Sequence, residues 1–182
     1  MKVGKTVYVK NRTEWRRWLA KHGKTAREIW LIYYKKNSGK PRISYNDAVD
    51  EALCYGWIDG ILKPIDERKY AQRYSPRRKT SKLSDMNRER VRRLVKSGLM
   101  TKAGLDAIAH TGKGSATLPA DILARVKRDP TTWKNFQGFP ASYKRIRICW
   151  IHAARQRREV FEQRLRYFIK MTAQNKRFGM VQ

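Results

Sequence analysis

Acidic residues, cysteines and long apolar runs are scarce in this chain of 182 residues. Only 15 Asp and Glu stand against 43 Lys and Arg, so internal pairing cannot neutralise the formal charge of +28. Two cysteines argue against a disulfide framework and favour a reducing compartment. No apolar run reaches the roughly 18 residues of a membrane-spanning helix, and the N-terminus has no secretory signal pattern. These absences predict a cytoplasmic protein without a membrane span.

The positive charge is spread over segments that have the composition to fold. Apolar residues make up 41% of the chain and aromatic residues 11%, which is enough for a hydrophobic core. Basic and acidic residues number 13 and 6 in residues 1–60, 15 and 5 in 61–118, 4 and 2 in 119–139, and 11 and 2 in 140–182. Because no tail carries the excess, we expect a folded protein whose positive potential attracts polyanions such as nucleic acid.

Capping residues and hydrophobic spacing predict the first elements. Asn11 begins an amphipathic helix that Gly23 ends. Residues 29–34, IWLIYY, are β-branched and aromatic without polar alternation, which indicates a strand covered on both faces. Ser44 begins a second helix, which Gly56 closes.

A hairpin and two further helices are expected before residue 112. Residues 57–75 form the hairpin, in which alternation places Tyr70 and Tyr74 on one face. Ser84 caps a helix that continues to about Lys96, and a shorter helix follows after Thr101. The apolar side of the longer helix is predicted to consist of Val91, Leu94 and Val95.

These elements predict an α+β protein with a small, mostly antiparallel sheet, packed helices and a C-terminal helical module. The α+β body spans residues 1–112, a Gly- and Ser-containing linker spans 113–118, and the helical module spans 119–182. Pro119 and Pro130 suit the first turns of helices in that module.

Three motifs resemble a known family. ALCYGWIDG at residues 52–60, DERKYAQRYSPRR at 66–78 and SKLSDMNRERVRRLVKSGLMTKAGL at 81–105 resemble the signature of the YdeI/OmpD-associated family. Residues 118–179 are similar to that family's C-terminal helical region, which carries a bacteriocin-protection label. The resemblance implies a role in stress or antimicrobial-peptide resistance, and it supplies no reaction, cofactor or catalytic residue.

The chain departs from the family pattern at two places. Leu83 stands where the family usually has Trp, and Val160 with Phe161 replaces a Thr-Arg pair after Glu159. A polar site built from that second segment in relatives would be weakened in this chain.

A basic cluster gives the leading functional hypothesis. Residues 68–93 hold eleven basic residues against two acidic ones. Arg88, Arg92 and Lys96 recur every four residues on one helix side, where like charges repel unless an anion such as phosphate neutralises them. The predicted polyanion site consists of Arg73, Arg77, Arg78, Arg88, Arg92 and Lys96. The C-terminal helices add Arg155, Arg157, Arg158, Arg164 and Arg166. The alternative is a solvated face that serves solubility.

A second hypothesis is a pocket for a small ligand, or an enzyme site of unknown reaction, around the ALCYGWIDG motif. Tyr55 and Trp57 would supply apolar walls, Asp59 a carboxylate, and Arg77 and Arg78 cations. The favoured interpretation of these residues is ordinary architecture, with Trp57 in the core and Asp59 capping a turn and pairing with arginine. A third hypothesis is an adaptor that docks an acidic protein partner.

Metal and cofactor sites are not expected. Cys149 and His152 share one helix face, but five Cys and His in total make a four-ligand zinc site improbable. Cys54 follows a helix whose C-terminal end disfavours a thiolate, which indicates a packed thiol. The sequence therefore predicts a non-enzymatic binding protein.

Overall fold

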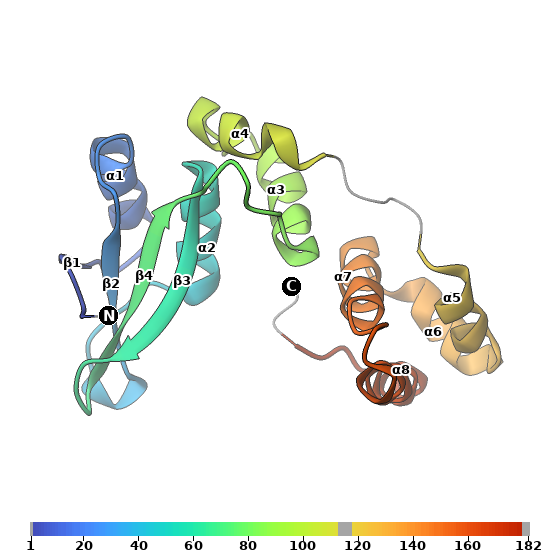
Figure 1. Ribbon diagram of the computed structural model, residues 1–182. Coiled ribbons are helices and arrows are strands. Elements are labelled where there is room, and N and C mark those ends of the chain that lie inside the picture. Colours follow the sequence, from blue (N-terminus) through green and yellow to red (C-terminus); the bar gives the residue numbers. More distant parts are fainter. Residues whose placement is uncertain (1, 113–117, 180–182) are drawn as a thin grey trace. The chain divides into compact units, whose positions relative to one another are not determined.

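The fold is α+β, as predicted, and is seen in a computed structural model that describes residues 2–112 and 118–179 (Figure 1). The chain divides into two compact units. Residues 1–83 and 90–112 form the N-terminal unit, and residues 84–89 with the chain from 113 onward form the C-terminal unit. No helix among the described residues has both the length and the apolar character that crossing a membrane requires.

The N-terminal unit is built on a four-stranded mixed sheet in the order β1-β2-β4-β3. β1 (Thr6–Tyr8) pairs in parallel with β2 (Ile29–Tyr34), whose bounds are those predicted from its sequence. β3 (Trp57–Pro64) and β4 (Lys69–Pro76) form the predicted antiparallel hairpin, and β4 also pairs antiparallel with β2. The carboxylate of Asp66 accepts two backbone hydrogen bonds in the hairpin turn. Only β1 was absent from the sequence prediction.

The two faces of the sheet differ in what covers them. Helices α1 (Arg12–His22) and α2 (Tyr45–Cys54) pack on one face. The core on that side contains Trp15, Leu19, Ala48, Ala52, Ile29, Leu31, Tyr33, Trp57 and Tyr74. The opposite face carries a small cluster of Trp30, Ile32 and Ala71, with Tyr8 and Tyr34 packed against it. The predicted double burial of β2 is confirmed.

The predicted helix caps are confirmed. Asn11, Ser44 and Ser84 each accept a hydrogen bond from the backbone N–H three residues on, at 3.0, 3.1 and 3.3 Å. Gly56 has a φ of 74°, and a Cβ there would lie 2.9 Å from the carbonyl oxygen of Ala103. Both the positive φ and the close approach therefore require glycine at this helix end.

Helices α3 (Asp85–Lys96) and α4 (Lys102–Ile108) complete the N-terminal half of the chain. Val91 and Leu94 are buried as predicted, but the expected burial of Val95 is wrong, because its side chain is 51% exposed. The buried side of α3 is rotated towards Arg90, which is only 8% exposed.

Within residues 118–179, the C-terminal unit has the helices α5 (Ala120–Lys127), α6 (Pro130–Gly138), α7 (Ala141–His152) and α8 (Arg158–Ala173), and it also includes the first residues of α3. Pro130 occupies the first turn of α6, as predicted, whereas Pro119 stands at the N-cap of α5. The core of this unit consists of Ile122, Val126, Phe136, Phe139, Tyr143, Ile148, Ile151, Leu165 and Phe168. The GKGS segment and the predicted linker lie mostly outside the described residues.

Candidate polyanion-binding surface

Some cations of the basic cluster are engaged inside the protein by Asp50 of α2. The side chain of Asp50 is 4% exposed and accepts hydrogen bonds from Arg90 at 2.8 Å and from Arg93. Arg90 also donates to the side-chain oxygen of Asn46 at 2.6 Å. A buried carboxylate that binds two guanidinium groups fixes α3 to α2, so these arginines are structural.

The neighbouring residue Glu51 binds the other flank of α2 to α1. Its carboxylate is 1% exposed and contacts Arg12 and Arg16, the latter at 2.7 Å. Burial lowers the pKa of both guanidinium groups, but hydrogen bonds and charge attraction from Glu51 outweigh burial and raise each pKa. Both arginines therefore remain charged and serve packing.

Two of the predicted site residues, Arg73 and Arg77, make contacts within the N-terminal unit. Arg73 lies on β4 and forms a 2.7 Å ion pair with Glu28, whose pKa it lowers by hydrogen bonding. Arg77 is 7% exposed, and its Nη1 donates to the carbonyl oxygen of Lys82 at 3.3 Å. Burial lowers the pKa of Arg77, against the attraction of Asp59. We therefore leave Arg77 out of the polyanion surface.

The other predicted cations lie on α3 and on the loop before it. Arg92 and Lys96 are exposed on α3, and Arg88 is half-buried one turn earlier. Leu83, at the end of the loop, is buried in one cluster with Val91 and Leu94 and so ties the loop to α3. We define the α3 surface as the exposed residues Arg78, Lys79, Lys82, Arg92 and Lys96. Neither residues 77–83 nor residues 90–96 contain an acidic residue.

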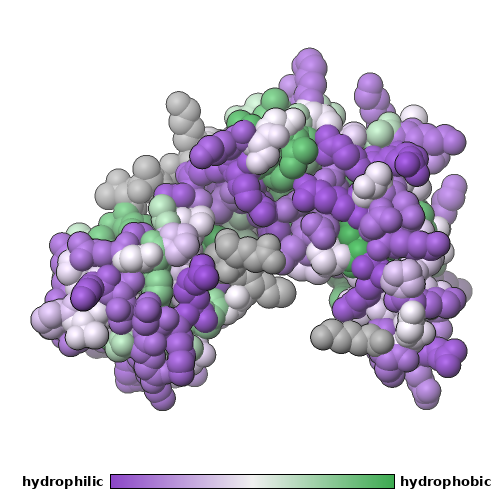
Figure 2. Space-filling model, turned by 180° about the vertical axis from the view of Figure 1, so that it is seen from behind, coloured by the Kyte–Doolittle hydropathy of each residue, from purple (hydrophilic) through white to green (hydrophobic). Residues whose placement is uncertain are grey.

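The C-terminal cations are divided between packing and exposure. Nη2 of Arg155 donates to both carboxylate oxygens of Asp121, at 3.0 and 2.9 Å. Arg164 donates to the carbonyl oxygen of Trp150 at 2.6 Å and lies over the ring of that residue. Arg157, Arg158 and Arg166 are exposed, and Arg155 is exposed as well despite its ion pair. Figure 2 shows hydrophilic residues over most of one face of the molecule.

The residues of the alternative pocket are placed in different surroundings. Trp57 is 1% exposed and donates from its indole N–H to the carbonyl oxygen of Gly23 at 3.1 Å, which places it in the core. Tyr55 is half-buried under the guanidinium of Arg16, 5.4 Å from its ring centre. Arg78 is exposed. The structure thus brings together only part of the set predicted from the sequence.

Asp59 belongs to a polar cluster under α2 that sequence reasoning missed. Its carboxylate accepts hydrogen bonds from the hydroxyl of Tyr45 at 2.9 Å and from the amide of Gln72 at 3.3 Å. Burial, with the nearby carboxylate, raises the pKa of Tyr45 to about 12. The hydroxyls of Tyr33 and Tyr74 lie 3.1 Å apart, and burial raises the pKa of both. Gln72 was the available signal, because a polar residue interrupts the aromatic face of β4.

Cys54 is buried at the end of α2, as expected for a packed thiol. Burial raises the pKa of this thiol to about 11, so it is not an activated nucleophile. Among the residues that the structure describes, no group of three or more metal-ligating side chains comes together.

Two protein-family models match different parts of the chain. Residues 7–107, more than half of the chain, match the family model described as a domain of unknown function (DUF8412). Residues 115–175 match the model described as Bacteriocin-protection, YdeI or OmpD-Associated. The chain belongs to the DUF8412 family and carries a YdeI/OmpD-associated region. That part of the predicted resemblance is confirmed, while the ALCYGWIDG motif lies inside the DUF8412 match. No curated protein and no solved structure matches the chain.

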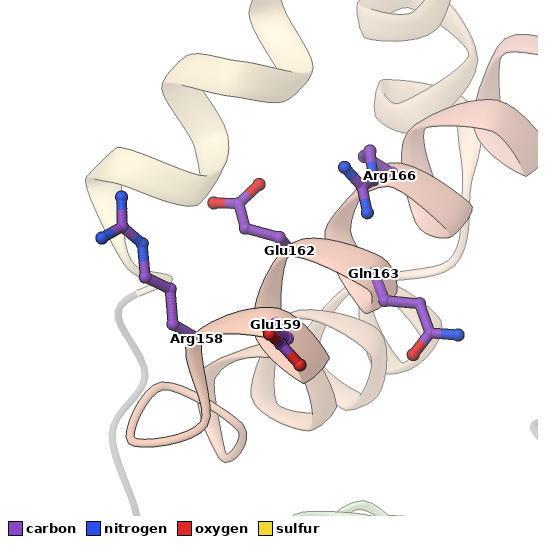
Figure 3. A pocket seen from close by; sticks show the side chains of 5 residues that line it. All are labelled: Arg158, Glu159, Glu162, Gln163 and Arg166. Carbon is purple, nitrogen blue, oxygen red and sulfur yellow. The ribbon is translucent and has the colours of Figure 1, made fainter.

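The YdeI/OmpD-associated region has a surface hollow of about 510 Å³ along α8. Figure 3 shows Glu162 between Arg158 and Arg166, and Glu159 and Gln163 also line the hollow. The carboxylate of Glu162 is already bound by Arg125 at 2.8 Å, an interaction that lowers its pKa. The lining alternates in charge and one carboxylate is engaged, so this hollow offers less to an anion than the α3 surface does.

The substituted segment of this region serves packing. Val160 and Phe161 are half-buried, and Phe161 packs against the C-terminal core. The guanidinium of Arg155 lies 5.2 Å from the centre of the Phe161 ring. An aromatic residue at this position therefore fills space and supports a cation.

Proposed function

We propose that the protein is a non-enzymatic, cytoplasmic binding protein whose α3 surface contacts nucleic acid, or another polyanion, without reading its sequence. The observation that supports this proposal is the absence of acidic residues from both segments that form the surface. Two nearby buried acids are engaged by other arginines, since Asp50 of α2 binds Arg90 and Arg93 and Glu89 of α3 binds Arg145. Lys and Arg side chains bind the phosphates of any nucleic acid and do not read its bases.

Salt dependence is the first test of this proposal. Each phosphate that the protein neutralises on a DNA duplex contributes about −0.9 to the slope of log affinity against log salt. Contact with roughly four to six phosphates therefore predicts a slope of about −4 to −5 in a fluorescence titration. A flat response between low and physiological salt would end the proposal.

A matched pair of double variants tests the surface itself. Arg92→Glu with Lys96→Glu reverses two charges four residues apart on α3, and Arg17→Glu with Lys21→Glu makes the same change on exposed positions of α1. We expect the α3 pair to weaken binding to all sequences equally, at least about tenfold more than the α1 pair, and to reduce the salt slope by about 2. Equal losses from both pairs would show that net charge alone drives binding.

A small-ligand site is the second candidate, favoured by one observation. Arg77 is buried, and its Nε and Nη2 have no hydrogen-bond partner, although Asp59 lies close enough to influence its pKa. Burying a cation with unsatisfied hydrogen-bond donors is unfavourable unless an anion accepts those hydrogen bonds. In this case Asp59→Asn abolishes ligand binding and leaves both folding and polyanion binding intact. Loss of polyanion binding in that variant would contradict two separate sites.

The positive charge of the chain limits how the family label of bacteriocin protection can apply to it. A protein of formal charge +28 repels cationic peptides, so direct capture of such peptides is disfavoured. A role in stress or peptide resistance would then act through the anionic polymers that those peptides also bind. An acidic protein partner is the remaining alternative, and it predicts a complex in pull-down that survives nuclease treatment.

A further inference from the structure

The face of the sheet opposite α1 and α2 carries aromatic side chains without a helix over them. Register places Tyr8 of β1 beside Ile32 of β2 and Ala71 of β4, all on this face. Val3 of the N-terminal segment packs on this face, and the hydroxyl of Tyr8 donates to the carbonyl oxygen of Pro41 in the loop after β2. Figure 1 shows α1 and α2 on the other side of the sheet. Trp30, Ile32 and Ala71 are buried on this face, whereas Tyr8 and Tyr34 at its rim are half-buried.

Cations surround these rings. Tyr8 meets Tyr34 edge-on, with ring centres 5.0 Å apart. The ammonium groups of Lys40 and Lys69 lie 4.7 and 6.0 Å from the centre of the Tyr34 ring. Arg73 lies on the same face, two residues along β4 from Ala71, and is paired with Glu28 at 2.7 Å. Lys69 is also paired, with the exposed Asp66 at 3.5 Å. The face therefore combines ring surface with positive charge, which neither a plain core nor a solvated polar face requires.

We infer that this sheet face is a platform for single-stranded nucleic acid. Bases of a single strand are free to stack on aromatic rings while cations bind the adjoining phosphates, whereas a duplex hides its bases. A base stacking on Tyr34 would displace the ammonium groups of Lys40 and Lys69 from the ring, and the adjoining phosphates would then bind them. An exposed cation–ring contact contributes less than a base stacked on an aromatic ring does. Replacing the first contact by the second therefore favours binding.

The platform rests on the proposed function for the class of its ligand, but it lies on a different surface from α3 and makes a different prediction. Charge on α3 attracts single and double strands alike. Stacking on the sheet discriminates between them, because only single strands supply accessible bases.

The experiment titrates the full chain with a labelled oligothymidylate of about 12 nucleotides and with a duplex of the same length. The unsubstituted protein is expected to bind the single strand more tightly. Tyr34→Leu should weaken single-strand binding about tenfold and duplex binding by less than about twofold. Tyr34→Phe keeps the ring and should restore binding. Tyr167→Leu, at an exposed tyrosine of α8, is the control and should change neither affinity.

Each outcome decides the inference. Equal loss for both probes in Tyr34→Leu, or equal affinity of the unsubstituted protein for both probes, would overturn the platform and leave α3 binding in place. Binding of neither probe would overturn the platform together with the proposed function. If Tyr34→Leu lowers the melting temperature, the double variant Lys40→Gln with Lys69→Gln takes its place and is compared with Tyr34→Phe. Loss of both ammonium groups should lower the affinity for the single strand, whereas Tyr34→Phe should keep it.

Discussion

Replacing Asp50 with Asn tests whether a buried carboxylate of α2 holds α3 in place. The Asp50 side chain is 4% exposed and binds Arg90, whose own side chain is 9% exposed, at 2.8 Å. It also binds Arg93, whose side chain is 52% exposed. Asn preserves the size of the side chain and one acceptor but removes the negative charge. The guanidinium of Arg90 then remains buried without a countercharge.

The expected cost follows from how far each partner can return to water. Breaking a buried ion pair by removing one partner typically costs about 3 to 5 kcal/mol, because the other charge stays desolvated. Arg93 is half exposed and regains water, and Arg90 keeps its 2.6 Å bond to Asn46. We therefore expect a loss near the lower limit, about 3 kcal/mol in the free energy of unfolding.

Urea unfolding followed by tryptophan fluorescence measures this loss against a matched control. Asp106→Asn removes the same charge from the exposed pair of Lys102 and Asp106, which lie 2.9 Å apart with side chains 88% and 63% exposed. Exposed pairs contribute less than about 1 kcal/mol, and both variants raise the net charge equally. If Asp50→Asn lowers the urea midpoint no more than the control does, the structural role of the buried clamp is refuted.

Three further predictions use the same unfolding assay. Gly104→Ala should lose about 1 to 3 kcal/mol, because its Cβ would lie 2.2 Å from the carbonyl oxygen of Cys54, whereas Gly138→Ala, with nothing within 4 Å, should lose nothing. At alkaline pH, the raised pKa of Tyr45, about 12, means that its contribution is complete below pH ~10 and is lost as pH rises towards 12. Tyr45→Phe should flatten that loss, and an alkaline limb as steep as in the unsubstituted protein would contradict the assignment. At acid pH, the lowered pKa of Glu162 means that its contribution is present above pH ~4.3 and is lost below it; Glu162→Gln should flatten that fall, and an unchanged acid limb would contradict the assignment.

Local patterns in the sequence predicted much of the fold. The bounds of β2 followed from a run of six apolar and aromatic residues, and the helix starts followed from Asn11 and Ser44. Each of these signals acts within a few residues, because capping and strand burial depend on neighbouring backbone groups and side chains. β1 escaped prediction because its three residues become a strand only by pairing with β2.

The candidate site was less predictable than the fold. The sequence marked Arg73, Arg77 and Arg92 alike as cations of one cluster, yet the first pairs with Glu28, the second is buried, and the third is exposed. The expected burial of Val95 failed for a related reason. α3 turns towards Arg90 because Asp50, forty residues earlier in the chain, supplies a buried partner.

The amino-acid sequence by itself determined that the chain is strongly cationic, that it forms an α+β fold, and where most helices and strands begin. Composition and spacing along the chain contain that information in full. Only the tertiary structure decided which cations are structural and which face solvent. That choice depends on carboxylates such as Asp50 and Glu51, which meet arginines 35 to 43 residues away. Charge pairing across such separations is set by how the helices pack.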